Sequence, residues 1–164
     1  LTLWQPWAQL VALGHKRIET RSWGTSYRGP LAIHAALYFS REAQARLLEP
    51  AFVRALGRDT AMAFPLGKVV AVCRLAGCER CTARNTPGEP ELSFGDYGPG
   101  RWLWRLEDVR ALPVPAAACG KQGLWEWEPP AELAAWLDAA PFPAERMTAD
   151  GGNERQRAIG SNVG

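Results

Sequence analysis

The stretch Gly14-His-Lys-Arg-Ile-Glu-Thr-Arg21 holds the densest charged chemistry of the chain. Its β-branched residues and alternating pattern predict an extended segment. Side chains alternate across a strand, so Glu19 and Arg21 share one face, whereas Ile18 and Thr20 share the other. If the Glu19 face points inward, a carboxylate and a guanidinium meet at low dielectric, where they must pair or contact a ligand.

Lys16 stands just before this strand and is expected at the mouth of the same face. Together with Glu19 and Arg21 it would form a cationic pocket in which the Glu19 carboxylate is the one proton acceptor. Such a pocket can hold an anion or a polar nucleobase, and it can also move protons. The alternative interpretation is a solvated strand face with an ordinary ion pair.

Outside this octet the chain shows short strand and helix patterns. Strands are expected at residues 1–4, 31–36, 68–75, 101–106 and 124–127. Alternation in 101–106 places Trp102, Trp104 and Leu106 on the core face. Helices are expected from Pro6 to Gly14, from Ser40 to Gly57 with either a kink or the start of a second helix at Pro50, and after Pro129. Residues 76–100 are predicted to form a long loop and residues 109–123 a proline-punctuated crossing. The pattern favours an α+β domain around a curled sheet or barrel.

Length and composition indicate one domain. The chain has 164 residues, and its formal net charge of +2 is too small to argue for nucleic acid by itself. Residues 1–143 are expected to form the domain, and residues 144–164 a polar, glycine-containing tail or mobile segment. The longest uncharged stretch, Leu1–Gly14, is too short to cross a bilayer and lacks a basic leader. We therefore expect no membrane partner and a cytoplasmic location.

Four cysteines raise the question of a metal. The spacing of Cys73, Cys78, Cys81 and Cys119 resembles a ferredoxin pattern, and a C-x2-C pair could suit zinc. However, no histidine lies near the cluster and no second C-x2-C pair exists. Cys73 also falls in a strand pattern, where a small buried hydrophobe belongs. The sequence therefore predicts no metal site and no cofactor.

Several further residues are candidates for contacts with a ligand or nucleic acid. These are Trp4, Gln5, Trp23, His34, Lys121 and Gln122. Trp23 precedes a glycine-containing turn and is the better candidate for stacking on a base. Gln5 either contacts a base edge or caps a helix. His34 lies opposite the apolar face of its predicted strand, toward either the cleft or water. A phosphate-steering rim could be formed by Arg28, Arg80, Arg84 and Arg101.

The octet resembles the G-x-K-x-x-E-x-R signature of the ASCH domain (activating signal cointegrator-1 homology) at all four defined positions. The flanking segments that resemble other parts of this family are Leu3-Trp-Gln-Pro-Trp-Ala8, Trp102-Leu-Trp104 and Gln122-Gly-Leu-Trp125. The resemblance therefore spans roughly residues 1–127. It implies a PUA-like small β-barrel of about five to six strands, with two to four flanking helices and a cleft lined by the signature residues.

The resemblance also implies a function. Members of the family are linked to RNA or DNA binding and to RNA metabolism, which favours RNA or a modified nucleoside as the ligand here. The alternative is a hydrolase that acts on RNA or on an acylated nucleoside such as N4-acetylcytidine. In that case Glu19 would be the general base and Lys16 would stabilise an oxyanion. The amidohydrolase branch carries Thr in the slot of Glu19, so this chain departs from it at a catalytic position.

Overall fold

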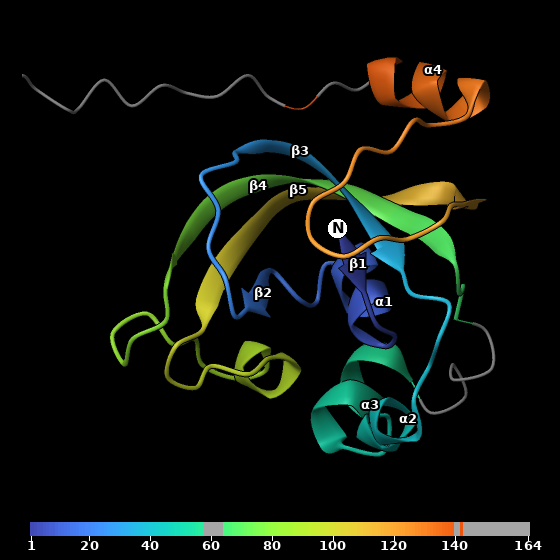
Figure 1. Ribbon diagram of the computed structural model, residues 1–164. Helices are drawn as coiled ribbons and strands as arrows, with labels where there is room; N and C mark the ends of the chain where they lie inside the picture. Colours follow the sequence, from blue (N-terminus) through green and yellow to red (C-terminus); the bar gives the residue numbers. More distant parts are fainter. Residues whose placement is uncertain (58–63, 140–141, 143–164) are drawn as a thin grey trace, which may run out of the picture.

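The computed structural model describes residues 1–57, 64–139 and 142. Its centre is one five-stranded sheet with the strand order β1-β3-β4-β5-β2. The strands are β1 (Thr2–Leu3), β2 (Ile18–Arg21), β3 (Gly29–Ala35), β4 (Lys68–Arg80) and β5 (Trp102–Ala117). Figure 1 shows β3, β4 and β5 as a curved arch, with the short strands β1 and β2 below it.

The pairing of the strands leaves the sheet open, with β1 and β2 at its two edges. β1 pairs with β3 in parallel, whereas the other neighbours are antiparallel. β2 pairs with the first residues of β5, so that Glu19 lies opposite Trp104. The predicted α+β class and a sheet of five strands are therefore confirmed.

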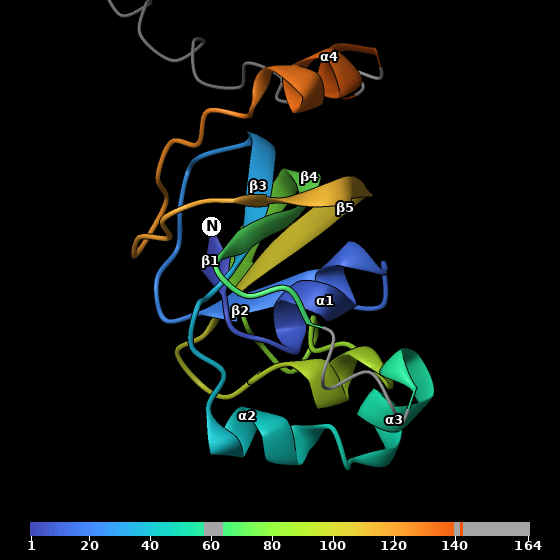
Figure 2. The same cartoon turned by 90° about the vertical axis from the view of Figure 1, so that its right-hand side faces the viewer.

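Four α-helices accompany this sheet in the described part of the chain. They are α1 (Trp7–Ala12), α2 (Arg41–Arg46), α3 (Pro50–Leu56) and α4 (Ala131–Ala139). Ser40 caps α2 by accepting a hydrogen bond from the Ala43 amide at 3.1 Å, as its position predicts. Of the two alternatives at Pro50, the start of a new helix is the observed one, and α3 ends at Gly57 with φ of 80°. Figures 1 and 2 show α1, α2 and α3 below the arch and α4 above it.

The main core lies between the curved sheet and α1. It includes Trp104 and Leu106 on β5, both of which are fully buried, as the alternation of β5 predicts. Cys73 on β4 is also buried in this core, where the sequence pattern places a small hydrophobe. Burial raises the pKa of its thiol to about 12. The burial of Trp104, Leu106 and Cys73 could therefore be predicted from periodicity, whereas Trp102, on the same predicted face of β5, is only partly buried.

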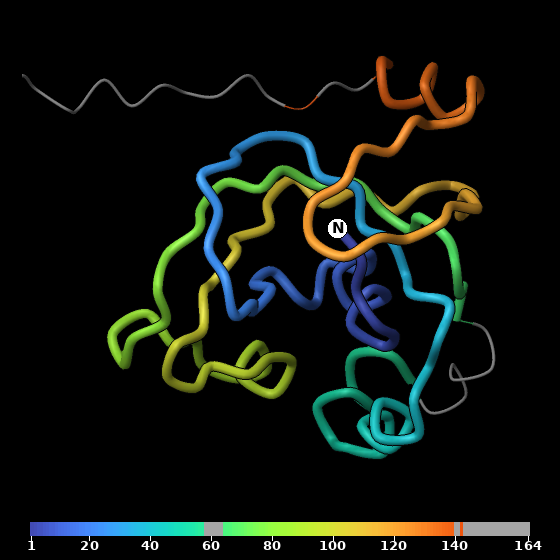
Figure 3. Tube along the Cα trace, viewed as in Figure 1, coloured from blue at the N-terminus to red at the C-terminus, as the bar shows by residue number. Residues whose placement is uncertain are grey.

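Two predicted segments are wrong in extent, because β4 and β5 are longer than the patterns indicate. Figure 3 traces the path of the chain through this region. β4 continues to Arg80 and β5 to Ala117, so the predicted loop 76–100 and crossing 109–123 both begin as strand. The pairing jumps from Ala71↔Ala111 to Val69↔Ala116. The bulge between these pairs accommodates the prolines of β5, which cannot donate to a regular ladder.

The strand predicted at residues 124–127 is also wrong. This segment forms no ladder and is held by side chains, because Trp125 Nε1 donates to Thr2 Oγ1 at 3.2 Å. Trp127 packs against apolar residues of β4, β5 and α4. The predicted tail, residues 144–164, lies outside the described residues. No helix in the described part of the chain is both long enough and apolar enough to span a membrane.

Candidate functional site

Lys16 is the most deeply buried charged group of the octet, with a side chain only 1% exposed. Its Nζ donates to the carbonyls of Ile18 at 2.5 Å and Phe94 at 2.9 Å. The same ammonium lies 3.6 Å from Glu19 Oε2. These three partners match the three N–H groups of an ammonium. The expectation that Lys16 lies at the mouth of the site is therefore wrong, because the turn after α1 directs it inward.

Glu19 and Arg21 lie on one face of β2, as the alternation predicts. The side chain of Glu19 is 11% exposed, and its Oε1 lies 3.7 Å from Arg21 Nη1. Arg21 also donates from Nη2 to the Thr2 carbonyl at 3.2 Å, which connects β2 to β1. Its Nε is buried and has no hydrogen-bond partner among the described residues. The Glu19 carboxylate is thus held between two cations, one below it and one beside it.

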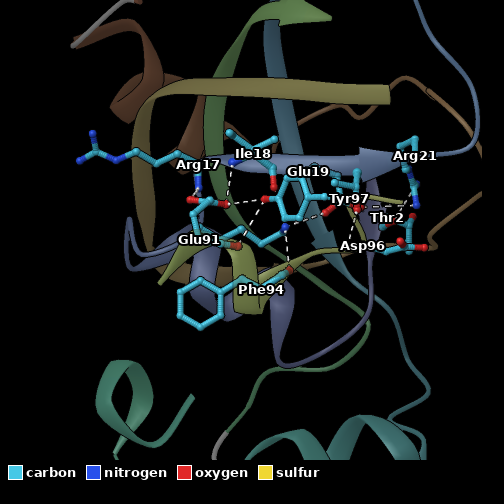
Figure 4. Close-up of polar contacts among 11 residues, drawn as sticks. Thr2, Arg17, Ile18, Glu19, Arg21, Glu91, Phe94, Asp96 and Tyr97 are labelled. Atoms are coloured by element: carbon cyan, nitrogen blue, oxygen red, sulfur yellow. Dashed lines mark hydrogen bonds and ion pairs between the residues drawn. The ribbon is translucent and has the colours of Figure 1, made fainter. Parts of the chain in front are cut away.

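A segment far along the chain holds this strand in place (Figure 4). Glu91, in a short 3-10 helix (η2, Glu91–Phe94), accepts from the amides of Arg17 at 2.9 Å and Ile18 at 3.1 Å. The Tyr97 hydroxyl donates to Glu91 Oε1 at 3.4 Å. Burial, and then the charge of Glu91, raises the pKa of Tyr97, so the phenol stays protonated. The segment 76–100 therefore helps to position the strand that carries Glu19 and Arg21.

A cavity of about 410 Å³ opens beside Glu19 and Arg21 and is called the Glu19 cavity below. Its lining is Thr2, Leu3, Trp4, Trp7, Glu19, Thr20, Arg21, Arg46, Ser93, Phe94, Gly95, Asp96 and Arg101. Trp4 is 56% exposed, so part of its ring is free for a ligand. Arg101 pairs with Asp96, its Nε lying 2.7 Å from the carboxylate. This volume is within the range of small-molecule sites.

The cavity contains residues that sequence reasoning missed. Arg46 on α2, Asp96 and the backbone at Gly95 line it, and Thr20 lies at its wall beside Glu19. Thr20 Oγ1 accepts from the Asp96 amide at 3.2 Å. The only signal for the 93–96 segment was the length of the predicted loop, because long loops in compact domains often serve a function. Nothing in the sequence indicated Arg46.

Gln5 and His34 are buried away from the Glu19 cavity and have structural partners. Gln5 Oε1 accepts from the Gln9 amide at 3.0 Å, and its Nε2 donates to the Pro65 carbonyl at 3.0 Å. Of the two alternatives for Gln5, the helix cap is therefore the observed one. His34 Nε2 lies 3.0 Å from the Ala118 carbonyl, and burial lowers the pKa of its imidazole. Neither residue lines the Glu19 cavity.

Three other candidates also lie outside this cavity. Trp23 packs edge-on against Trp104, with ring centroids 4.7 Å apart, so its ring serves the core and Trp4 takes the place beside the cavity. Lys121 and Gln122 are exposed, and the Lys121 carbonyl accepts from Thr2 Oγ1 at 3.0 Å. The structure therefore brings Trp4, Glu19 and Arg21 together at the cavity, with Lys16 beneath Glu19. Gln5, Trp23, His34, Lys121 and Gln122 do not line it.

The cysteines do not form a common site in the described residues. All four thiols are free, and no group of three or more His, Cys, Asp or Glu there is arranged to hold a metal ion. Cys78 Sγ accepts from the Thr25 amide at 3.3 Å, whereas Cys81 Sγ donates to the Tyr97 carbonyl at 3.1 Å. Cys78 lies on β4 and Cys81 follows the end of that strand, and each thiol forms a hydrogen bond with the backbone of another segment.

Comparison with protein families gives one match. The model of the ASCH domain matches residues 1–92, which include the elements from β1 to the end of β4. The matched region contains Lys16, Glu19, Arg21 and Glu91. No curated protein matches the chain.

Proposed function

Since the chain belongs to the ASCH domain family, we propose that it binds RNA and holds one unpaired nucleotide in the Glu19 cavity. Family membership is consistent with RNA binding in general. The observation that carries the finer proposal is the buried Lys16–Glu19–Arg21 cluster, which faces the cavity through Glu19 and Arg21 alone. A nucleoside-like small molecule with the same base would use the same contacts.

The chemistry of the cavity wall suits the edge of a nucleobase. The Glu19 carboxylate accepts hydrogen bonds, and the adjacent Arg21 guanidinium donates them, with an Nε that has no partner in the described residues. A Watson–Crick edge presents N–H donors beside carbonyl or ring-nitrogen acceptors. An acceptor and a donor held side by side can therefore pair with such an edge. Because the charges of Glu19 and Arg21 compensate each other, a neutral nucleobase can bind at this wall.

The rest of the cavity suits the face of the base and its phosphate. Trp4 supplies an exposed aromatic ring at the cavity wall, and base–aromatic stacking contributes about 1–3 kcal/mol. Arg46 and Arg101 lie at the same cavity, and arginine binds phosphate through its planar fork. A volume of about 410 Å³ suits one nucleoside better than an extended strand. Single-stranded RNA with a splayed base is therefore the proposed ligand.

We also propose that the sheet is a PUA-like barrel that remains open between β1 and β2. The two edge strands are bridged by a side chain, since Arg21 Nη2 on β2 donates to the Thr2 carbonyl on β1. The strong curvature of the sheet in Figure 1 supports this description. In such a barrel the nucleotide would bind where the two edges face each other.

Hydrolysis of RNA or of an acylated nucleoside is the alternative function. It would use Glu19 as a general base and a cation to stabilise the developing oxyanion. Lys16 is poorly placed for that second task, because its Nζ already contacts two carbonyls and Glu19, and Lys16 is not part of the cavity lining. Recognition without chemistry is therefore the better supported proposal.

The test measures binding of fluorescein-labelled single-stranded RNA by anisotropy, with a duplex RNA of the same sequence for comparison. Glu19→Gln and Arg21→Ala should each weaken binding by about tenfold, in line with the energy of one base-edge contact. Glu79→Gln and Arg105→Ala are the matched controls, because these residues form an exposed ion pair on β4 and β5. Both controls should bind like the unmodified protein.

Two outcomes would contradict the proposal. One is the absence of binding to any single strand at low salt, and the other is full affinity in Glu19→Gln. Incubation of the same RNA and of N4-acetylcytidine with the protein separates the two functions. Turnover that disappears in Glu19→Gln would favour the hydrolase, whereas binding without turnover supports recognition.

A further inference from the structure

A second cavity, separate from the Glu19 cavity, lies between the sheet and the C-terminal part of the described chain. It has a volume of about 750 Å³ and is called the Arg110 cavity below. Its floor includes Leu31 on β3 and Val72 on β4, and its other walls include Trp125, Trp127 and Leu137. In Figure 1 the segment that leads to α4 crosses over this side of the arch. The lining is mostly apolar and aromatic, as in sites for organic ligands.

Arg110 on β5 is the cationic group of this lining. Its guanidinium carbon lies 4.9 Å from the ring centroid of Trp136 and 4.8 Å from that of Phe142. The two aromatic rings thus contact the guanidinium by cation–π interactions, which use its faces. The hydrogen-bond donors of a guanidinium lie in its plane and are not satisfied by such contacts.

The two terminal nitrogens of Arg110, which carry four of those in-plane donors, have no acceptor in the described part of the protein. Arg110 Nη1 and Nη2 are both buried, and neither has a hydrogen-bond partner there. A buried charged donor that lacks an acceptor is costly, because it has lost its hydrogen bonds to water without replacing them. By contrast, Arg74 and Arg101 each lie within ion-pair distance of a carboxylate. Arg110 is therefore a cation without an acceptor in the part of the chain that the structure describes.

We propose that the Arg110 cavity binds a small organic monocarboxylate with an aromatic or aliphatic body. The carboxylate would accept from Nη1 and Nη2 together, which is the paired geometry that a guanidinium favours. The apolar body would lie against Leu31, Trp125 and Trp127. Asp138 and Glu126, which also line the cavity and are exposed, would repel a polyanion. RNA is therefore not the ligand of this site, and the inference is independent of the proposed function.

The test is isothermal titration of the protein with 3-phenylpropionate, alongside its neutral amide, 3-phenylpropionamide. The carboxylate should bind saturably, and the amide should bind at least about tenfold more weakly, because it cannot form a charge-assisted pair. Arg110→Met keeps the apolar stem of the side chain and should bind the carboxylate about tenfold more weakly than the unmodified protein does. Arg105→Met, an exposed arginine on the same strand, is the matched control and should bind the carboxylate normally.

Folding of the variants is checked by thermal unfolding. Arg110→Met should unfold at the same or a higher temperature than the unmodified protein, because it removes an unpaired buried cation. A second variant, Ala32→Phe, narrows the cavity without changing Arg110 and should also weaken binding. The proposal is overturned if the carboxylate fails to saturate, if the amide binds equally well, or if Arg110→Met retains full affinity.

Discussion

Lys16 Nζ lies 3.6 Å from Glu19 Oε2, and almost no part of Lys16 reaches solvent. The lysine therefore acts beneath the carboxylate, where it compensates the charge and holds the side chain. It also connects β2 to the Phe94 carbonyl, 78 residues further along the chain. The cation of the signature is thus a structural support for the cavity wall, and Glu19 and Arg21 are the groups that can contact a ligand.

Lys16→Met should lower the free energy of unfolding by about 3–5 kcal/mol. The variant removes one partner of a buried pair and leaves Glu19 without its lower cation. Urea unfolding followed by tryptophan fluorescence measures this loss. The double variant Lys16→Met/Glu19→Gln should recover part of it, because the remaining carboxylate charge is gone. Equal stability of Lys16→Met and the unmodified protein would show that Lys16 does not form a buried ion pair with Glu19.

Glu91→Ala should destabilise the fold by about 1.5–3 kcal/mol and weaken RNA binding as well. Its carboxylate accepts from the amides of Arg17 and Ile18, and hydrogen bonds to charged groups lie in this energy range. The control is Glu89→Ala, whose carboxylate accepts from the Ser93 hydroxyl in an exposed contact. Urea unfolding and RNA anisotropy provide the two measurements. An effect of Glu91→Ala no larger than that of Glu89→Ala would refute its role in positioning β2.

Trp4→Ala should weaken binding of single-stranded RNA by about 1–3 kcal/mol, with little change in stability. The ring of Trp4 is 56% exposed and lines the Glu19 cavity, so its removal leaves the core intact. Tyr38→Ala is the control, because Tyr38 is an exposed aromatic residue that lines neither cavity. Anisotropy titrations measure the affinity of both variants for single-stranded RNA. If Trp4→Ala and Tyr38→Ala bind RNA equally, stacking on Trp4 has no part in recognition.

RNA affinity should fall as the salt concentration rises, because bound arginines displace counterions from phosphates. Arg46 and Arg101 line the Glu19 cavity and are the proposed phosphate contacts. Each single change to alanine should reduce the slope of log affinity against log salt by about one. Titrations at several salt concentrations measure the slope, and Arg105→Ala should leave it unchanged. Unchanged slopes in both cavity variants would exclude these arginines as phosphate contacts.

His34 should make the protein less stable in mild acid. Burial lowers the pKa of its imidazole from the ordinary 6.5, so the unfolded chain takes up a proton at a higher pH than the folded protein. The free energy of unfolding is therefore highest above pH 6.5 and falls as the pH drops from there through the folded pKa. Urea unfolding at about pH 5 and about pH 7.5 measures the change.

The His34→Gln variant isolates this effect. It should lose less stability between the two pH values than the unmodified protein, because its side chain does not titrate. His15→Gln is the matched control, since His15 is exposed and is the only other histidine of the chain. A pH dependence that is the same in His34→Gln and in the unmodified protein would contradict the assignment.

Local sequence signals predicted much of the framework. Alternation on β2 placed Glu19 and Arg21 together, and alternation on β5 placed Trp104 and Leu106 in the core. Ser40 predicted the start of a helix correctly, because its hydroxyl can satisfy a free amide within the first turn. These predictions succeed because side-chain direction and helix capping depend only on residues a few positions apart.

By itself, the sequence determined which residues share a face of a strand and where helices begin and end, since steric and hydrogen-bond rules act over short spans. Only the tertiary structure decided that Lys16 is buried, because its partner Phe94 comes from a distant segment. Likewise, the length of β5 depends on its pairing with β4, and the isolation of the Arg110 guanidinium depends on where α4 packs. Burial and the presence or absence of a partner are properties of the assembled chain, since contacts between distant residues create them.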